Sequence, residues 1–215
     1  MKAMIIRESG EPTVFEVADL PVPEIGPGQV LVRVAATSVN PVDWKIRKLG
    51  LSLGPAMPAV LQGDVSGVVE AVGADVTAFA VGDEVYGCAG GVKGTGGALA
   101  EFMACDWEYL APKPTNLSMV EAAALPLICL TAWEGLVEGA DVEWGQTVLV
   151  HAGVGGVGHV VAQIAIARGA TVYATVSGPE KAELVKGFGA IPINYRENSV
   201  EEYVAVHTGG VGFDI

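Results

Sequence analysis

Short hydrophobic runs separated by turn residues fill the chain up to about residue 115. Gly, Pro and Asp between the runs are typical of several short β-strands in a barrel or sandwich. One helix is expected among them, because Asn40 can cap a helix, Pro41 suits its first position and Gly50 follows its end. The predicted strands are residues 3–6, 30–34, 67–72, 84–86 and 99–103.

The pattern changes after residue 116. Ser118 and Glu121 have the spacing of a capping box, which opens an apolar helical run, and a second helix is expected over residues 127–138. Strands and helices then alternate, over residues 147–151, 157–168, 171–176, 179–186 and 191–194. Such alternation predicts a parallel sheet with helical crossovers. We therefore expect a β-barrel catalytic domain over residues 1–116 and an α/β domain over residues 117–215.

The sequence Gly-Val-Gly-Gly-Val-Gly at residues 153–158 joins a predicted strand directly to a predicted helix. In that setting, GxGxxG predicts the phosphate loop of a Rossmann fold, with a doubly wound parallel sheet. The first glycine would permit a tight turn, the second would let a pyrophosphate approach, and the last would let helix and strand pack closely. The alternative is a tight turn that binds nothing. The predicted cofactor contacts are Gly153, Gly155, Gly156, Val157 and Gly158.

The end of the second strand of this unit bears on the choice of cofactor. An NAD site places Asp or Glu there to bind the ribose 2′-hydroxyl, whereas this chain has Ser177 and no carboxylate before Glu180. Ser177 can donate to a 2′-phosphate, and Lys181 lies one helical turn beyond it. NADP(H) is therefore favoured, although Lys181 can equally be a solvated helix residue.

Charge and composition exclude several other functions. The net charge is −13 and no run of Lys or Arg exists, which disfavours nucleic acid and an anionic membrane as partners. The cysteines Cys88, Cys105 and Cys129 are far apart, which fits neither a disulfide framework nor a zinc knot. No apolar run is long enough for a membrane span or a signal peptide. A cytoplasmic protein is expected.

Five further segments match one known family in the correct order. They are residues 40–47 (Asn-Pro-Val-Asp-Trp-Lys-Ile-Arg), 63–73, 82–87, 122–127 and 131–133. With the glycine loop, they make the chain resemble the N-terminal two thirds of a zinc-independent quinone oxidoreductase, the zeta-crystallin-like type of medium-chain dehydrogenase/reductase in the alcohol dehydrogenase superfamily. The resemblance implies a GroES-like barrel followed by a Rossmann domain, and a homodimer at full length.

The same resemblance predicts that the chain is truncated. Complete members return to the barrel after the sixth strand of the Rossmann sheet, and only three strands and the start of a fourth, at residues 212–215, are expected here. An incomplete sheet would expose an unpaired strand, so more chain is expected to be needed for a soluble, active protein.

Zinc-using relatives bind a catalytic metal through Cys, His and Cys. The corresponding positions hold Asn40, Gly63 and Leu127, none of which can replace those ligands, so no zinc is expected. His151, at the end of a predicted strand, is expected to be packed or hydrogen-bonded. Alcohol oxidation would lack its Lewis acid, whereas NADPH can reduce a quinone or an α,β-unsaturated carbonyl directly.

The resemblance also suggests roles for side chains. It places Asn40, Asp43 and Thr131 near the nicotinamide half of the cofactor, and Tyr195 near the 2′-phosphate. Lys45 replaces a Tyr of many relatives, and in a cleft it could stabilise enolate charge or donate a proton. Asn40, Asp43 and Lys45 are therefore the candidate catalytic residues. The plainer alternatives are a helix cap for Asn40, a first-turn acid for Asp43, a buried helix hydroxyl for Thr131 and a surface position for Lys45.

Three functions stay open. The main hypothesis is an NADPH-dependent reductase that transfers hydride to a small quinone or enone without metal. The second is an NADPH-binding protein with a structural or sensing role and no turnover. The third is the enoyl reductase module of a larger synthase, although no carrier or linker sequence supports it.

Overall fold

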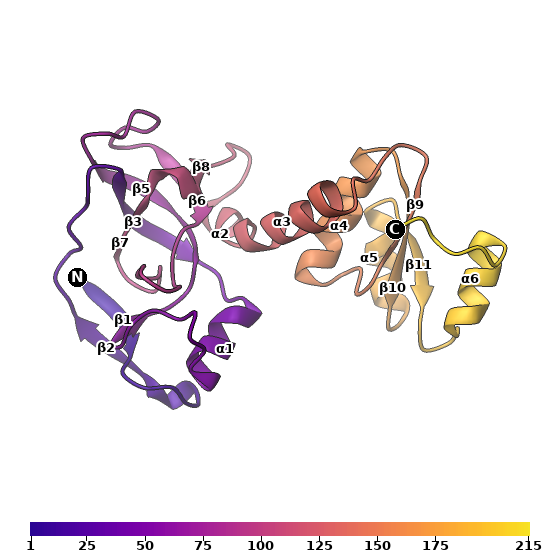
Figure 1. Cartoon of the computed structure of the whole chain (residues 1–215), viewed down its shortest axis with the longest axis horizontal. Coiled ribbons are helices and arrows are strands. Elements are labelled where there is room, and N and C mark those ends of the chain that lie inside the picture. The colour runs from indigo at the N-terminus through magenta and orange to yellow at the C-terminus, as the bar shows by residue number, and fades with distance from the viewer. The chain divides into compact units, whose positions relative to one another are not determined.

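The computed structural model describes residues 1–215 as two compact units, residues 1–127 and 128–215 (Figure 1). The first unit extends beyond residue 116 because α2 (Met119–Ala123) packs on its strands, where the Ser66 hydroxyl donates to the Met119 carbonyl at 2.6 Å. The division into domains at residue 116 stays a prediction.

Two antiparallel sheets form the first unit. The larger has the strand order β7-β3-β5-β6-β8 and the smaller β2-β1-β4, with an isolated bridge between Ala3 and Ala100. Alternate residues of β3 and β5, such as Val30, Val32 and Val69, are fully buried, as expected for strands with one face on the core. The strands are β1 (Lys2–Ile6), β2 (Phe15–Asp19), β3 (Gln29–Thr37), β4 (Ala59–Val60), β5 (Asp64–Val72), β6 (Glu84–Cys88), β7 (Phe102–Asp106) and β8 (Leu110–Pro112).

One of the predicted strands is misplaced, while the predicted helix is confirmed. The strand expected at residues 99–103 begins only at Phe102, because the chain before it bonds to two different segments: Leu99 accepts from the Met4 amide at 2.9 Å and donates to Leu61 at 3.2 Å. The helix α1 (Pro41–Leu49) has Asn40 at its N-cap position and ends at Gly50, whose φ is 61°.

The second unit has a parallel sheet of order β11-β10-β9 with α4 packed on β9 and β10 and α5 packed on β10 and β11. Two predicted strands are matched to the residue, and the first ends one residue early, at Val150. The elements are β9 (Thr147–Val150), α4 (Gly156–Ala167), β10 (Thr171–Val176), α5 (Pro179–Gly187), β11 (Ile191–Asn194) and α6 (Val200–Thr208).

Three features of this part of the chain differ from the sequence-based expectations. The helix expected at 127–138 is α3 (Pro126–Trp133) followed by a π-helix (Glu134–Gly139). The helix α6 was not predicted, although Ser199 and Glu202 form a capping box before it. His151 is exposed in a turn rather than packed, because β9 ends before it.

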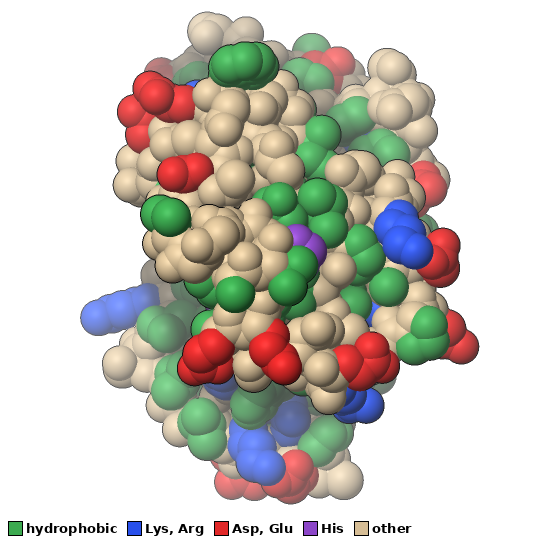
Figure 2. All heavy atoms as spheres, turned by 90° about the vertical axis from the view of Figure 1, so that its right-hand side faces the viewer, with side chains coloured by type: hydrophobic (Ala, Val, Ile, Leu, Met, Phe, Trp, Pro, Cys, Tyr) green, Lys and Arg blue, Asp and Glu red, His purple; other side chains and the backbone are tan.

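The last residues lie along the free edge of β9, as the start of a fourth strand would. The Leu149 amide donates to the Ile215 carbonyl at 2.8 Å, and the Ile215 amide donates to Thr147 at 3.1 Å. No helix combines the length and hydrophobicity that a membrane crossing requires. On the face in Figure 2, acidic side chains are dispersed among hydrophobic ones, consistent with the negative net charge.

Candidate functional site

The glycine loop of the second unit leaves a row of backbone amides without partners. Gly155 is the N-cap of α4, and its carbonyl accepts the first helical hydrogen bond, from the His159 amide at 3.0 Å. The amides of Gly156, Val157 and Gly158 therefore make no backbone hydrogen bond. Free amides at the positive end of a helix dipole form a site for an anion such as a pyrophosphate.

The glycines of the loop are needed for different structural reasons. The tight turn falls on Ala152, whose φ is 53°, and not on Gly153 as expected. Gly153 is required for packing, because a Cβ there would lie 2.6 Å from the Ala174 Cβ. A Cβ on Gly158 would lie 2.3 Å from the Ala152 carbonyl oxygen. A Cβ on Gly155 would lie 3.1 Å from that same oxygen, which is closer than an ordinary van der Waals contact, so this position also favours glycine.

Hydrogen bonds hold the loop against the middle strand of the parallel sheet. The Thr175 hydroxyl accepts from the Ala152 amide at 2.9 Å, and its carbonyl accepts from the Gly153 amide at 3.0 Å. Thr175 is buried, so these bonds are shielded from water. The loop conformation is therefore fixed by β10 before any ligand binds.

The residues predicted to select the cofactor lie at the same edge of the sheet as the loop. Val176, the last residue of β10, pairs in parallel with Asn194, and the Tyr195 amide donates to the Val176 carbonyl at 3.2 Å. Ser177 follows directly and is half-buried, while Lys181 is exposed on α5. Because the carboxyl ends of parallel strands meet at one edge, Ser177 and Tyr195 follow the same edge of the sheet as the glycine loop.

A buried carboxylate organises the candidate residues of the first unit. Asp64, the first residue of β5, has no exposed surface. Its side chain accepts hydrogen bonds from the Ser38 hydroxyl at 2.6 Å, the Asn40 side-chain amide at 2.7 Å and the Leu127 backbone amide at 3.0 Å. Three donors thus offset the cost of burying this carboxylate.

The side chain of Asn40 does more than cap α1. The residue occupies the N-cap position, and its backbone amide donates to the Asp43 carboxylate at 2.7 Å. Its side-chain nitrogen instead donates to Asp64 and, at 3.1 Å, to the Ser38 hydroxyl. The structure thus brings the two predicted residues Asn40 and Asp43 together with Asp64.

The surroundings of Asp64 shift two neighbouring groups. Burial raises the pKa of Asp43; the Asn40 amide lowers it in part, and the negative Asp64 raises it further. Burial, and then the charge of Asp64, raise the pKa of the Cys88 thiol to about 12. Cys88 therefore stays a neutral thiol at physiological pH and is a poor nucleophile.

Two predicted residues lie on the surface. Lys45 is exposed, with its Nζ 5.8 Å from the centre of the Trp44 ring, a geometry suited to a weak cation–π contact. Thr131 is exposed on α3, so its interpretation as a buried hydroxyl is wrong. Neither observation establishes a role for these side chains.

The residues at the positions of the zinc ligands do not fit a metal. Both hydrogens of the Asn40 side-chain amide are donated to Ser38 and Asp64, and Gly63 has no side chain. A Cβ on Gly63 would lie 2.7 Å from the Gly90 carbonyl oxygen. No group of three or more His, Cys, Asp or Glu side chains in the structure could hold a metal ion.

The sequence pattern does not identify Asp64 and Ser38 as site residues. A signal was present: Asp64 and Ser66 interrupt a run of buried strand residues, and a polar residue inside a core strand needs a reason. The partners of Asp64 come from three separate segments, so no local pattern reveals them.

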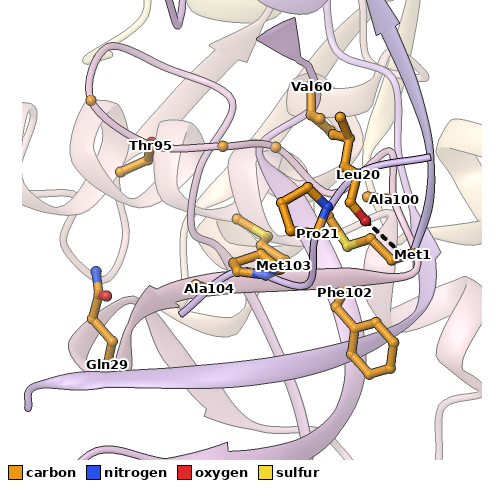
Figure 3. Close-up of a pocket in the computed structure, with 14 residues that line it drawn as sticks. Met1, Leu20, Pro21, Gln29, Val60, Thr95, Ala100, Phe102, Met103 and Ala104 are labelled. Atoms are coloured by element: carbon orange, nitrogen blue, oxygen red, sulfur yellow. Dashed lines mark hydrogen bonds between the residues drawn. The ribbon is translucent and has the colours of Figure 1, made fainter. Parts of the chain in front are cut away.

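A separate cavity of about 470 Å³ lies in the first unit and contains none of the predicted site residues (Figure 3). Its walls are mostly apolar, with Leu20, Pro21, Phe102 and Met103 among them, and the N-terminal amine of Met1 donates to the Leu20 carbonyl at 2.7 Å beside it. We assign it no part in the candidate site.

Two family models match the chain. Residues 26–115 match the alcohol dehydrogenase GroES-like domain, and residues 156–215 match the zinc-binding dehydrogenase domain. The first match covers the larger sheet of the first unit, and the second begins within the glycine loop and runs to the end of the second unit.

Three curated relatives are 36–41% identical to the chain over the aligned residues. It is 41% identical to a 2-methylene-furan-3-one reductase of Solanum lycopersicum over 94% of the chain and 54% of the relative. It is 39% identical to an NADPH-dependent alkenal/one oxidoreductase of Arabidopsis thaliana, with the same coverage. It is 36% identical to a quinone oxidoreductase of Rattus norvegicus over the whole chain and 65% of the relative. The chain thus spans about half the length of the first two relatives.

Two solved structures resemble the chain over nearly its whole length. An alcohol dehydrogenase superfamily protein from Novosphingobium aromaticivorans is 47% identical with a TM-score of 0.93, over 99% of this chain and 64% of that one. An NAD-dependent alcohol dehydrogenase is 40% identical with a TM-score of 0.91, over 99% of this chain and 69% of that one.

Proposed function

The chain belongs to the medium-chain dehydrogenase/reductase family of the alcohol dehydrogenase superfamily, among its quinone oxidoreductases and enone reductases. We propose that it is an NADPH-dependent reductase of quinones or α,β-unsaturated carbonyls that uses no metal. The observation that carries the proposal is the row of free amides at Gly156, Val157 and Gly158, beside a β10 end that bears no carboxylate.

Several features of the second unit favour NADPH as the cofactor. The free amides of the loop would hold the pyrophosphate. We assign Ser177 as the donor and Lys181 as the cation for a 2′-phosphate, with Tyr195 at the same edge of the sheet. The relative from Arabidopsis thaliana is named as an NADPH-dependent enzyme.

When bound, NADPH supplies the hydride that reduces the electrophilic carbon of the acceptor. The chain's own residues would orient the cofactor and exclude water from it. We assign Asn40, Asp43 and Thr131 to the nicotinamide half, and Lys45 to charge that develops on the acceptor oxygen. Cys88 is no competing nucleophile toward an enone, because its pKa of about 12 keeps it protonated.

The donor set supports metal-free chemistry. Asn40, Gly63 and Leu127 supply neither thiolate nor imidazole, and the Asn40 amide is fully engaged. An already electrophilic acceptor does not need the Lewis acid that alcohol oxidation requires. We therefore propose that alcohols are not oxidised at a useful rate.

The direct test is steady-state oxidation of NADPH by the purified protein with a panel of quinones, enones and simple alcohols. We expect turnover with quinones or enones that survives exhaustive treatment with a chelator. Activity that disappears with chelator and returns with zinc would overturn the metal-free proposal. Tight NADPH binding without reduction of any acceptor would favour a binding protein without turnover.

A matched pair of glycine variants makes the test specific to the loop. Gly155→Val adds a side chain at the N-cap residue, whose φ of −74° any residue can adopt. Its Cβ lies 3.1 Å from the Ala152 carbonyl oxygen, so the loop must shift by a few tenths of an ångström, and NADPH affinity should fall. Gly187→Ala adds a Cβ at a glycine of α5 with no atom within 4 Å, and it should leave the affinity unchanged.

A further inference from the structure

We propose that Asp64 is a positioning residue that locks the Asn40 side chain so that it presents only its oxygen to a ligand. The proposal rests on the proposed function for the identity of that ligand, but the locking itself follows from the contacts of the first unit. Asn40 would accept a hydrogen bond from the nicotinamide side of the cofactor and would not donate one to the acceptor oxygen.

The first step concerns which way the Asn40 amide faces. Asp64 accepts three hydrogen bonds and donates none in the structure. An ionised carboxylate can face only a donor, so the side-chain nitrogen of Asn40, and not its oxygen, must point at Asp64. The hydrogen-bond partners therefore decide which end of the Asn40 amide is nitrogen and which is oxygen.

The second step concerns the remaining hydrogen of that amide. An amide nitrogen carries two hydrogens, and those of Asn40 go to Asp64 at 2.7 Å and to the Ser38 hydroxyl at 3.1 Å. Ser38 in turn donates to Asp64 at 2.6 Å, which closes a triangle of three side chains. No hydrogen of the Asn40 side chain remains for a ligand.

The third step concerns the oxygen that is left over. In the capping box of α1, the side-chain oxygen of Asn40 faces the backbone amide of Asp43, which takes up one of its two lone pairs. No other donor in the structure reaches this oxygen, and the residue is 6% exposed. An acceptor with a fixed orientation and a second lone pair is suited to an N–H or O–H donor on a ligand.

The consequence is a change in the role of Asn40. A residue whose donors are all engaged cannot stabilise a developing enolate or hydroquinone anion, which needs donors. Its oxygen can accept from the carboxamide N–H of a nicotinamide or from a ribose hydroxyl. Asn40 is therefore a binding residue whose polarity Asp64 determines, and another group must meet the anionic oxygen of the acceptor.

The decisive experiment exchanges the two polar groups. In Asp64→Asn, the new amide can present nitrogen to Asn40, which then rotates and offers nitrogen outward. In Asn40→Asp, two carboxylates face each other. The double variant Asp64→Asn with Asn40→Asp restores one donor facing one acceptor, with a free acceptor oxygen again at position 40. Asp75→Asn, an exposed acid of the same unit, is the control.

We expect each single variant to raise the KM for NADPH by about tenfold, with a smaller change in kcat, and the double variant to recover to within about threefold of the wild type. A side chain that served only folding would not give this recovery. A double variant no better than the singles would overturn the proposal.

Nuclear magnetic resonance of the side-chain amides gives a readout without turnover. The Asn40 NH₂ pair, assigned from its loss in Asn40→Ala, should exchange slowly with deuterium in the wild type and fast in Asp64→Asn, with no change in Asp75→Asn. Equal exchange in the wild type and Asp64→Asn would overturn the locking. If locking holds but no acceptor consumes NADPH, the proposed function fails and the positioning role of Asp64 stands.

Discussion

The two candidate clusters, one in each unit, are built from different kinds of chemical group. The glycine loop of the second unit works through backbone amides, and its side chains are mostly absent. The Asp64 cluster of the first unit works through side chains that satisfy one another away from solvent. Adding atoms to the loop should therefore weaken ligand binding, whereas removing a side chain from the Asp64 cluster should lower stability.

The largest expected effect follows from adding one carbon to the loop. Gly158→Ala places a Cβ 2.3 Å from the Ala152 carbonyl oxygen, so the loop must move away from α4. A displacement of this kind should weaken NADPH binding by about a hundredfold. Titration calorimetry measures the affinity, and Gly187→Ala serves as the control. Unchanged affinity would mean that the loop does not position the pyrophosphate.

Removing the carboxylate of the Asp64 cluster should lower the stability of the fold instead. Asp64→Ala leaves three buried or half-buried donors without an acceptor, each worth about 1–3 kcal/mol, so the free energy of unfolding should fall by at least ~3 kcal/mol. Denaturant unfolding at equilibrium measures it, with Asp75→Ala as the exposed counterpart. A loss no greater than that of the control would contradict the role of Asp64.

A single side chain at the end of β10 should change the cofactor preference. Ser177→Asp introduces the carboxylate that NAD sites have, which repels a 2′-phosphate and can bind the ribose hydroxyls. The ratio of kcat/KM for NADPH to that for NADH should fall by on the order of tenfold to a hundredfold. Lys181→Ala should lower the same ratio less. Lys186→Ala, whose lysine pairs with Glu183, should leave it unchanged.

The smallest effect concerns the pH dependence of stability. Because the pKa of Asp43 is raised above its ordinary 3.8, the folded state holds this proton more tightly than the unfolded state. The corresponding stabilisation is complete below about pH 3.8 and is lost as the pH rises through the folded-state pKa. Asp43→Asn cannot lose a proton, so its stability relative to the wild type should increase over that interval. A difference that does not vary with pH would show that Asp43 is not shifted.

The difference between the backbone-built loop and the side-chain cluster of Asp64 also explains which of them could be predicted from the sequence. The loop, its strand and its helix were predictable because the glycine spacing and the hydrophobic runs on either side of it report backbone geometry directly. The turn on Ala152 was not, because its left-handed φ follows from the hydrogen bonds that Thr175 makes with the loop. Asp64 escaped detection because Ser38, Asn40 and Leu127 are brought to it only by the fold.

The central claim is that the glycine loop and the acid-free end of β10 bind NADPH in preference to NADH. Titration of the protein with each cofactor, followed by calorimetry at equal ionic strength, tests it most directly. We predict that NADPH binds at least about tenfold more tightly, as expected for charge-assisted bonds to a 2′-phosphate. Equal affinity, or tighter binding of NADH, would contradict the account.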